Sequence, residues 1–219
     1  SAHAQDAPEP PPRHPAAEDI AVEWEVMTNY VDGGGRFRSR LTLTNRSDVP
    51  LPATGWTLYF NFLRPIDGDS TPPTVTIERV NGDLFRMAPT DGFAPVRPGE
   101  RRTILFESPA AAVKAIDAPA GYYLVFAGQE GQPEPPAAVT EASVAPFTRP
   151  QQTDRGPADA VPVPTAASRF RHHQALERLP DSVVGRITPT PVALTPRPGG
   201  FVLNEIGRAS CRERVYCEV

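Results

Sequence analysis

Proline is spread unevenly along the chain, and its positions limit where strands and helices can form. Of the 28 prolines among 219 residues, five fall within 1–20, ten within 21–130 and thirteen within 131–200. Because proline lacks an N–H and fixes φ, it is depleted inside strands and helices. The ten central prolines lie mostly in short gaps between apolar runs. We therefore expect a folded domain at 20–130, between an extended segment at 1–19 and a Pro/Ala-rich linker at 131–180.

Within the expected domain, apolar and polar residues alternate with a period of two, which indicates β-strands. Short runs of this kind, or rich in β-branched and aromatic residues, occur at 22–26, 36–43, 56–62, 75–77, 84–85, 103–106 and 122–126. Gly, Pro, Asn and Asp separate the runs, and Asn81-Gly82 predicts a tight hairpin between two of them. About seven such strands in one domain indicate an all-β fold, an immunoglobulin-like antiparallel β-sandwich.

The alternation also predicts which large side chains face the core. The inward positions are expected to hold Trp24, Trp56, Phe60, Phe62, Phe106, Leu124 and Phe126. The outward face beside Trp56 carries Tyr59 and Asn61, and Tyr30 lies near a strand end. Because an outward tyrosine can stack its ring on the apolar C–H face of a sugar, these three residues are the candidate glycan contacts.

Charge and motif content exclude several other functions. The chain has 22 Lys and Arg against 26 Asp and Glu, so a nucleic-acid binder that tracks phosphates is not expected. No apolar run approaches the ~20 residues that cross a bilayer. The motifs of serine hydrolases, phosphate-binding loops and zinc proteases are absent. We therefore expect no catalytic residue, no metal and no cofactor.

Two clusters of charged residues have structural interpretations. Arg36, Arg38 and Arg40 lie on one strand face, which we interpret as a solvated or inter-module face rather than an anion site. Asp67 and Asp69 flank a glycine, a pattern typical of a turn, and they lack the full spacing of a calcium loop.

A further signal comes from four segments of the expected domain. They are GWTLYFNF at 55–62 with 64–66, NGDLFRMAPT at 81–90, the residues 93–100, and DAPAGYY at 117–123. In this order they resemble the N-terminal, carbohydrate-binding-like domain of bacterial chitobiases and β-N-acetylhexosaminidases of glycoside hydrolase family 20. That domain is a β-sandwich similar to cellulose-binding domains, so the resemblance implies the fold that the strand count predicts.

The resemblance continues beyond the sandwich. FTRP at 147–150 and TAASRF at 165–170 resemble the family's connecting segment, and a short helix is expected near 169–179 between Ser168 as N-cap and Pro180 as stop. TPTP at 188–191 and GGFVL at 199–203 resemble the first strand and turn of the next module. In these enzymes that module is a small α+β domain before a (β/α)₈ barrel. The resemblance thus implies an incomplete α+β domain at 181–205, truncated before the catalytic barrel.

The two ends of the chain carry signals of a different kind. Ala2-His3-Ala4 suits a signal-peptidase site, which indicates export to the periplasm or the extracellular space. IGRASCRERV at 206–215 reads as a translated DNA-sequencing adapter, so we interpret 206–219 as an artefact of gene assembly. Both cysteines, Cys211 and Cys217, lie in that tail, so they carry no expected disulfide or metal role.

The resemblance also implies a function for the parent enzyme, which removes terminal N-acetylhexosamine residues from chitooligosaccharides and glycoconjugates. Its Asp–Glu catalytic pair sits in the barrel, and no residue of this chain matches it. We therefore expect a non-catalytic polysaccharide-binding-like module of a secreted β-N-acetylhexosaminidase, inactive as a hydrolase by itself. The expected partners are chitin-like or N-acetylglucosamine-containing glycans and, within the parent protein, the catalytic domain. The alternative is a purely structural sandwich that supports the barrel without contacting glycan.

Overall fold

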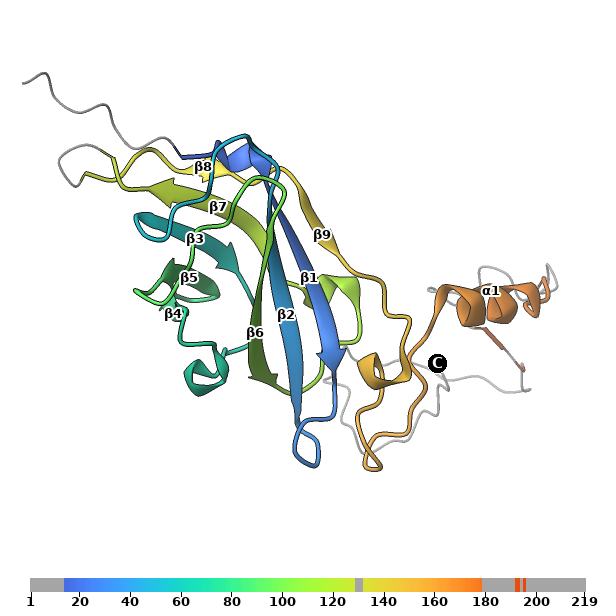
Figure 1. Ribbon diagram of the computed structural model, residues 1–219. Helices are drawn as coiled ribbons and strands as arrows, with labels where there is room; N and C mark the ends of the chain where they lie inside the picture. Colours follow the sequence, from blue (N-terminus) through green and yellow to red (C-terminus); the bar gives the residue numbers. More distant parts are fainter. Residues whose placement is uncertain (1–13, 129–131, 179–191, 194, 196–219) are drawn as a thin grey trace, which may run out of the picture. The chain divides into compact units, whose positions relative to one another are not determined.

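The chain forms two β-sheets packed face to face (Figure 1). The computed structural model describes residues 14–128, 132–178, 192, 193 and 195. The elements are β1 (Ile20–Thr28), β2 (Arg36–Asn45), β3 (Trp56–Asn61), β4 (Val75–Asn81), β5 (Leu84–Pro89), β6 (Arg101–Pro109), β7 (Ala120–Phe126), β8 (Ala137–Ala138), β9 (Ala142–Val144) and α1 (Ala166–Gln174). One sheet has the order β6-β2-β1-β9 and the other β4-β5-β3-β7-β8. The expected all-β sandwich is confirmed, and β1 to β7 correspond to the seven runs of the sequence.

Local sequence accounts for how neighbouring strands connect. Gly82 has a φ of +57°, which suits the tight turn between β4 and β5, and a register shift precedes it at Arg79/Asn81. The pairs within the sheets are antiparallel, except that β9 runs parallel to β1 over three residues. A parallel partner requires a long connection, so β9 comes from far along the chain.

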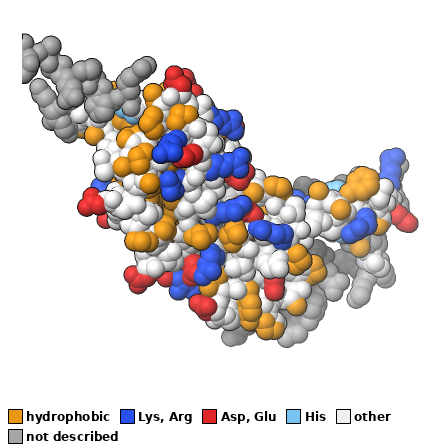
Figure 2. All heavy atoms as spheres, viewed as in Figure 1, with side chains coloured by type: hydrophobic (Ala, Val, Ile, Leu, Met, Phe, Trp, Pro, Cys, Tyr) orange, Lys and Arg blue, Asp and Glu red, His pale blue; other side chains and the backbone are white. Residues whose placement is uncertain are grey.

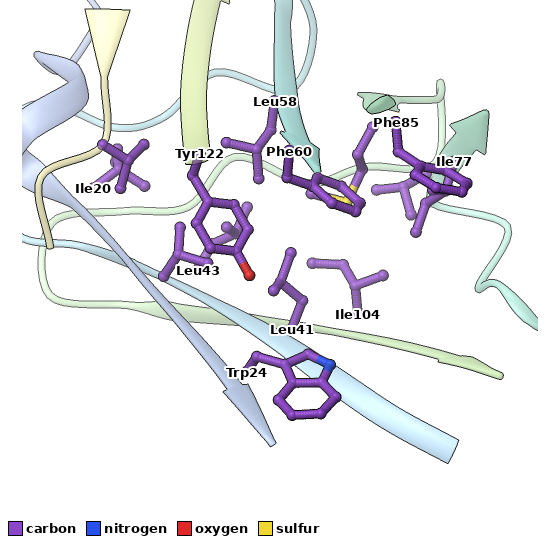
Figure 3. Packing of buried hydrophobic residues seen from close by; sticks show 14 of the residues in the cluster. Ile20, Trp24, Leu41, Leu43, Leu58, Phe60, Ile77, Phe85, Ile104 and Tyr122 are labelled. Atoms are coloured by element: carbon purple, nitrogen blue, oxygen red, sulfur yellow. The ribbon is translucent and has the colours of Figure 1, made fainter. Parts of the chain in front are cut away.

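The hydrophobic core lies between the two sheets, as Figure 3 shows. The seven side chains expected in the core are each at most 4% exposed. Aromatic pairs connect several of them, with Phe62 against Phe106 at 5.9 Å between ring centroids. Trp56 also donates a hydrogen bond from Nε1 to the carbonyl oxygen of Pro52 (2.9 Å). The two tryptophans therefore serve as core residues and not as surface contacts.

The segment 132–152 packs on the sandwich, where the proline density of 131–180 predicts an extended linker. Val139 and Gln152 are buried, and β8 and β9 extend the two sheets at their edges. The Gln152 amide donates to the Val26 carbonyl (2.9 Å) and accepts from the backbone N–H of Thr148 (2.8 Å) and Arg149 (2.7 Å). The expectation fails here because proline disfavours the interior of an element but not an edge strand or a packed loop.

The helix α1 also begins earlier than expected. Thr165 is its N-cap and accepts a hydrogen bond from the backbone N–H of Ser168 (3.1 Å), while Ser168 Oγ accepts from the backbone N–H of Thr165 (2.9 Å). This reciprocal pair places Ser168 at the third helical position and not at the cap. The helix ends at Gln174, within a second unit that runs from Pro164 onward.

Several sequence-based expectations lie outside the described residues. These are the extended segment up to residue 13, the Pro180 helix stop, the strand and turn at 188–203 except for 192, 193 and 195, and the tail at 206–219. In the part of the chain that is described, no helix has the length and apolar character needed to span a bilayer.

Candidate functional site

A straight row of side-chain positions crosses the outer face of the five-stranded sheet. Register places Glu78 of β4 opposite Arg86 of β5, and Arg86 opposite Tyr59 of β3. Tyr59 in turn lies opposite Tyr123 of β7, which pairs with Ala138 of β8. Because side chains alternate between the faces of a strand, all five point away from the core. We call these five residues the cross-strand row.

The two tyrosines of the row stack on one another. Their ring centroids are 4.8 Å apart and their planes differ by 5°. This separation matches the spacing of neighbouring strands, about 4.8 Å, so the stack runs across the sheet from β3 to β7. Each ring has one face covered by the other. The remaining faces are directed toward Arg86 on one side and Ala138 on the other.

The charged end of the row is a two-point ion pair on the surface. Arg86 donates to one oxygen of Glu78 from Nε (2.9 Å) and from Nη2 (2.7 Å). The hydrogen bond to Glu78 raises the pKa of Arg86, which therefore stays protonated. Both side chains are about half exposed, at 52% and 55%. Such a pair contributes little to stability but offers polar groups to a ligand.

A hollow of about 350 Å³ lies beside the row on the same face. Thr57, Ala88 and Val125 line the hollow, and each lies two residues along its strand from a member of the row. Tyr59, Pro89 and Pro133 also line it. Small and apolar side chains at these positions leave a depression next to the tyrosine stack. This combination of a shallow apolar hollow, an aromatic wall and a polar pair can hold a ligand with both C–H and O–H surfaces.

The structure brings together only part of the expected glycan contacts. Tyr59 belongs to the row, and Asn61 is exposed at the end of β3, beyond a register shift. Tyr30 follows β1 of the other sheet, and its ring packs closely on Gly156 and Gly34. A Cβ atom at Gly156 would lie 2.3 Å from Tyr30 Cε2, so this tyrosine is held by a loop.

Tyr123 was not expected as an outward residue, because 122–126 forms one uninterrupted apolar run in the sequence. The alternation within that run is nevertheless clear, since Tyr122, Leu124 and Phe126 are buried and Tyr123 is half-buried. Two consecutive tyrosines in a strand must point to opposite faces. The alternation of side chains therefore places Tyr123 on the outward face, where it could have been identified from the sequence.

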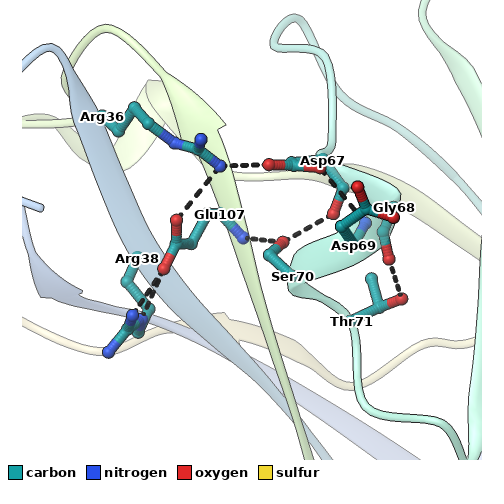
Figure 4. Close-up of polar contacts among 8 residues, drawn as sticks. All are labelled: Arg36, Arg38, Asp67, Gly68, Asp69, Ser70, Thr71 and Glu107. Atoms are coloured by element: carbon teal, nitrogen blue, oxygen red, sulfur yellow. Dashed lines mark hydrogen bonds and ion pairs between the residues drawn. The ribbon is translucent and has the colours of Figure 1, made fainter. Parts of the chain in front are cut away.

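Three arginines of β2 in the other sheet, Arg36, Arg38 and Arg40, are ion-paired, and Figure 4 shows the first two. Arg36 and Arg38 both contact Glu107, at 3.1 and 2.5 Å, and Arg36 also binds Asp67. The guanidinium of Arg36 lowers the pKa of Asp67 through that hydrogen bond. The side chain of Glu107 is only 11% exposed, so each arginine offsets a largely buried carboxylate.

The same arrangement repeats one step along β2. Glu25 of β1 binds Arg40 and also Arg149, which follows β9 in the chain. Figure 2 shows Lys and Arg side chains gathered over this four-stranded sheet, with hydrophobic side chains between them. Because Arg36, Arg38 and Arg40 each bind a carboxylate, these three guanidinium groups are interpreted as structural and not as an anion site. In the described residues, no three His, Cys, Asp or Glu side chains group in a way that could hold a metal ion.

Comparison with known proteins gives one family match. Residues 19–167 match the CHB_HEX family model, which is described as "Putative carbohydrate binding domain". No curated protein sequence matches the chain.

Solved structures show more distant likenesses. A GH20 exo-β-N-acetylglucosaminidase from Vibrio harveyi has 21% identity and a TM-score of 0.48, covering 60% of this chain and 19% of that chain. The chitin-binding domain of Chi18aC from Streptomyces coelicolor has 16% identity and a TM-score of 0.36, covering 52% and 94% of the two chains. The module CBM3b of cellobiohydrolase 9A from Clostridium thermocellum has 12% identity and a TM-score of 0.36, covering 53% and 94%.

Proposed function

Because the chain belongs to the CHB_HEX family of carbohydrate-binding domains, we propose that its sandwich binds glycan through the cross-strand row and the adjoining hollow. Chitin-like or N-acetylglucosamine-containing chains are the proposed ligands. Such sugars present apolar C–H faces and a ring of hydroxyl and amide groups. The tyrosine rings suit the C–H faces, and the Arg86–Glu78 pair suits the hydroxyl and amide groups.

The cross-strand row is the observation that carries this proposal. It concentrates two partly exposed tyrosines, a surface ion pair and an open hollow on one face of one sheet. Most other large aromatic side chains of the sandwich are buried in the core. Aromatic groups left at a surface beside a hollow are typical of recognition sites for ligands with both apolar and polar surfaces.

We further propose that the parent protein is an exported β-N-acetylhexosaminidase in which this module is non-catalytic. The resemblance of the segments at 55–66, 81–90 and 117–123 to the family 20 enzymes supports this context. The catalytic Asp–Glu pair of such enzymes would then belong to a barrel beyond the sandwich. The boundaries at 20 and 180 remain part of this proposal.

A structural role is the second candidate, and the ion-paired face of the four-stranded sheet favours it. Arg36, Arg38 and Arg40 have their charges satisfied, and Leu105 of β6 is 42% exposed among them. A face with satisfied charges and an exposed apolar side chain suits contact with another module of the same protein. The two roles involve opposite faces, so both can operate in one molecule.

Titration calorimetry of the full chain with hexa-N-acetylchitohexaose tests glycan binding. We expect measurable binding, and we expect Tyr59→Ala and Tyr123→Ala each to weaken it at least tenfold, or about 1.4 kcal/mol. Tyr30→Ala is the matched control, because that tyrosine lies outside the row, and it should keep the original affinity. Absence of binding by a folded protein would leave only the structural role.

A further inference from the structure

We propose that the outer face binds a single glycan chain edge-on, and does not adsorb to the flat surface of a crystalline polymer. This inference rests on the proposed function and specifies the physical form of the ligand. The orientation of the two tyrosine rings distinguishes the two forms.

A flat surface requires aromatic rings that lie side by side in one plane. Tyr59 and Tyr123 are parallel within 5°, but their centroids are only 4.8 Å apart. That separation is smaller than the width of a phenol ring, so the rings face one another and cannot share a plane. They consequently point their edges outward, and an edge offers little apolar area to a crystal surface.

One ring face of the stack is open to a ligand. Register places Ala138 of β8 next to Tyr123, and Ala137 and Ala138 are both exposed. A methyl group covers little of the neighbouring ring. The opposite end of the stack meets Arg86, whose guanidinium is held by Glu78. A pyranose ring can therefore stand upright above Ala138, with its C–H face against Tyr123.

The remainder of the face suits an extension of that same chain. From β5 to β8 the row spans three strand spacings, about 14 Å, which is the length of a short oligosaccharide. The hollow lined by Thr57, Ala88 and Val125 follows the stack along the strands. A depression accepts the uneven outline of one flexible chain, whereas a crystal face cannot enter it. The half-exposed Arg86 and Glu78 supply hydrogen bonds at the far end of the row.

Substitution of Ala138 tests the binding mode, because the two modes respond in opposite directions. Ala138→Tyr would cover the open face of Tyr123, so we expect at least a tenfold loss of affinity for hexa-N-acetylchitohexaose. If the protein instead adsorbs to crystals through a flat surface, an added aromatic residue should increase adsorption. Ala142→Tyr is the matched control, because Ala142 is an exposed alanine of β9 at the edge of the other sheet, and it should bind like the original protein. Both alanines are exposed, and thermal melting will verify that each variant is folded.

Two measurements on the full chain complete the test, namely calorimetry with the soluble hexasaccharide and depletion from solution by crystalline chitin. Three results together support the inference. The hexasaccharide binds the protein, Ala138→Tyr lowers the affinity for it, and crystalline chitin removes no more of the protein from solution than of serum albumin. Depletion by crystalline chitin, or unchanged hexasaccharide affinity in Ala138→Tyr, overturns the inference but leaves the proposed function in place. If the protein binds neither the hexasaccharide nor crystalline chitin, both the inference and the proposed function are overturned.

Discussion

Tyr122 and Tyr123 are adjacent in the sequence but occupy opposite faces of β7. Tyr123 stacks on Tyr59 at the outer face, while Tyr122 is buried and its hydroxyl points into the core (Figure 3). In the described residues, that hydroxyl has no hydrogen-bond partner. A buried polar group without a partner loses its interaction with water and gains nothing in return. Tyr123 is therefore available for recognition at the surface, whereas the unpaired hydroxyl of Tyr122 lowers the stability of the folded state.

Removing the Tyr122 hydroxyl should stabilise the protein. We expect Tyr122→Phe to raise the free energy of unfolding by about 1 kcal/mol, because the phenyl ring keeps the packing and loses the unpaired group. Urea denaturation at pH 7 measures the change. Tyr123→Phe is the control, and it should shift stability by less than about 0.5 kcal/mol. A destabilised Tyr122→Phe would indicate that the hydroxyl has a partner after all.

The burial of Tyr122 also predicts that the stability of the folded protein depends on pH in the alkaline range. Burial raises the pKa of Tyr122 above its ordinary value of 10.0, so the folded protein keeps the neutral form when the unfolded chain ionises. The stability associated with the neutral form is therefore fully present below pH 10 and is lost as the pH rises above it. The stability advantage of Tyr122→Phe over the original protein should accordingly grow between pH 10 and 11. A constant difference across that range would contradict a raised pKa.

At the scale of elements, the short strands β8 and β9 complete the sheets although they come from a proline-rich segment. β9 pairs with β1 at the edge of one sheet, and β8 pairs with β7 at the edge of the other. The buried amide of Gln152 then joins this segment to the carbonyl oxygen of Val26. An edge strand needs hydrogen bonds on one side only, so proline nearby does not prevent pairing. The segment thus covers edges that would otherwise be open to aggregation.

Truncation should therefore distinguish two possible ends of the sandwich. A fragment of residues 1–163 is expected to melt at the temperature of the full chain. A fragment of residues 1–130 loses β8, β9, Val139 and Gln152, and should be less stable by at least about 3 kcal/mol. Thermal melting followed by circular dichroism measures both. Equal stability of the two fragments would show that the segment is only a linker.

At the scale of the whole molecule, the two outer faces differ in kind. The five-stranded sheet has the tyrosine stack and the hollow, and the four-stranded sheet has arginines paired with Glu25 and Glu107. Arg86 on the first face and Arg36, Arg38 and Arg40 on the second are each paired with a carboxylate of the sandwich. The proposed glycan-binding role involves the first face, and the proposed contact with another module involves the second.

Hydrolysis is the activity that this arrangement should not support. We expect the full chain to show no turnover of 4-nitrophenyl N-acetylglucosaminide above the buffer rate, because the catalytic carboxylates of the proposed parent enzyme would lie in another domain. Release of nitrophenol measured at 405 nm, a standard wavelength for this product, provides the assay, and an intact β-N-acetylhexosaminidase is the positive control. Turnover that increases with protein concentration would require a catalytic site within this chain.

The sequence by itself determined the strands β1 to β7, their inward faces and the family. Trp24, Phe60 and Leu124 could be assigned to the core because the period of two is a local property of each strand. The tertiary structure alone decided which outward residues meet. Tyr59 faces Tyr123 and Arg86 through pairing between strands far apart in the chain, and such register depends on the packing of whole sheets. The site is a product of that pairing, so one strand read alone reveals only Tyr59.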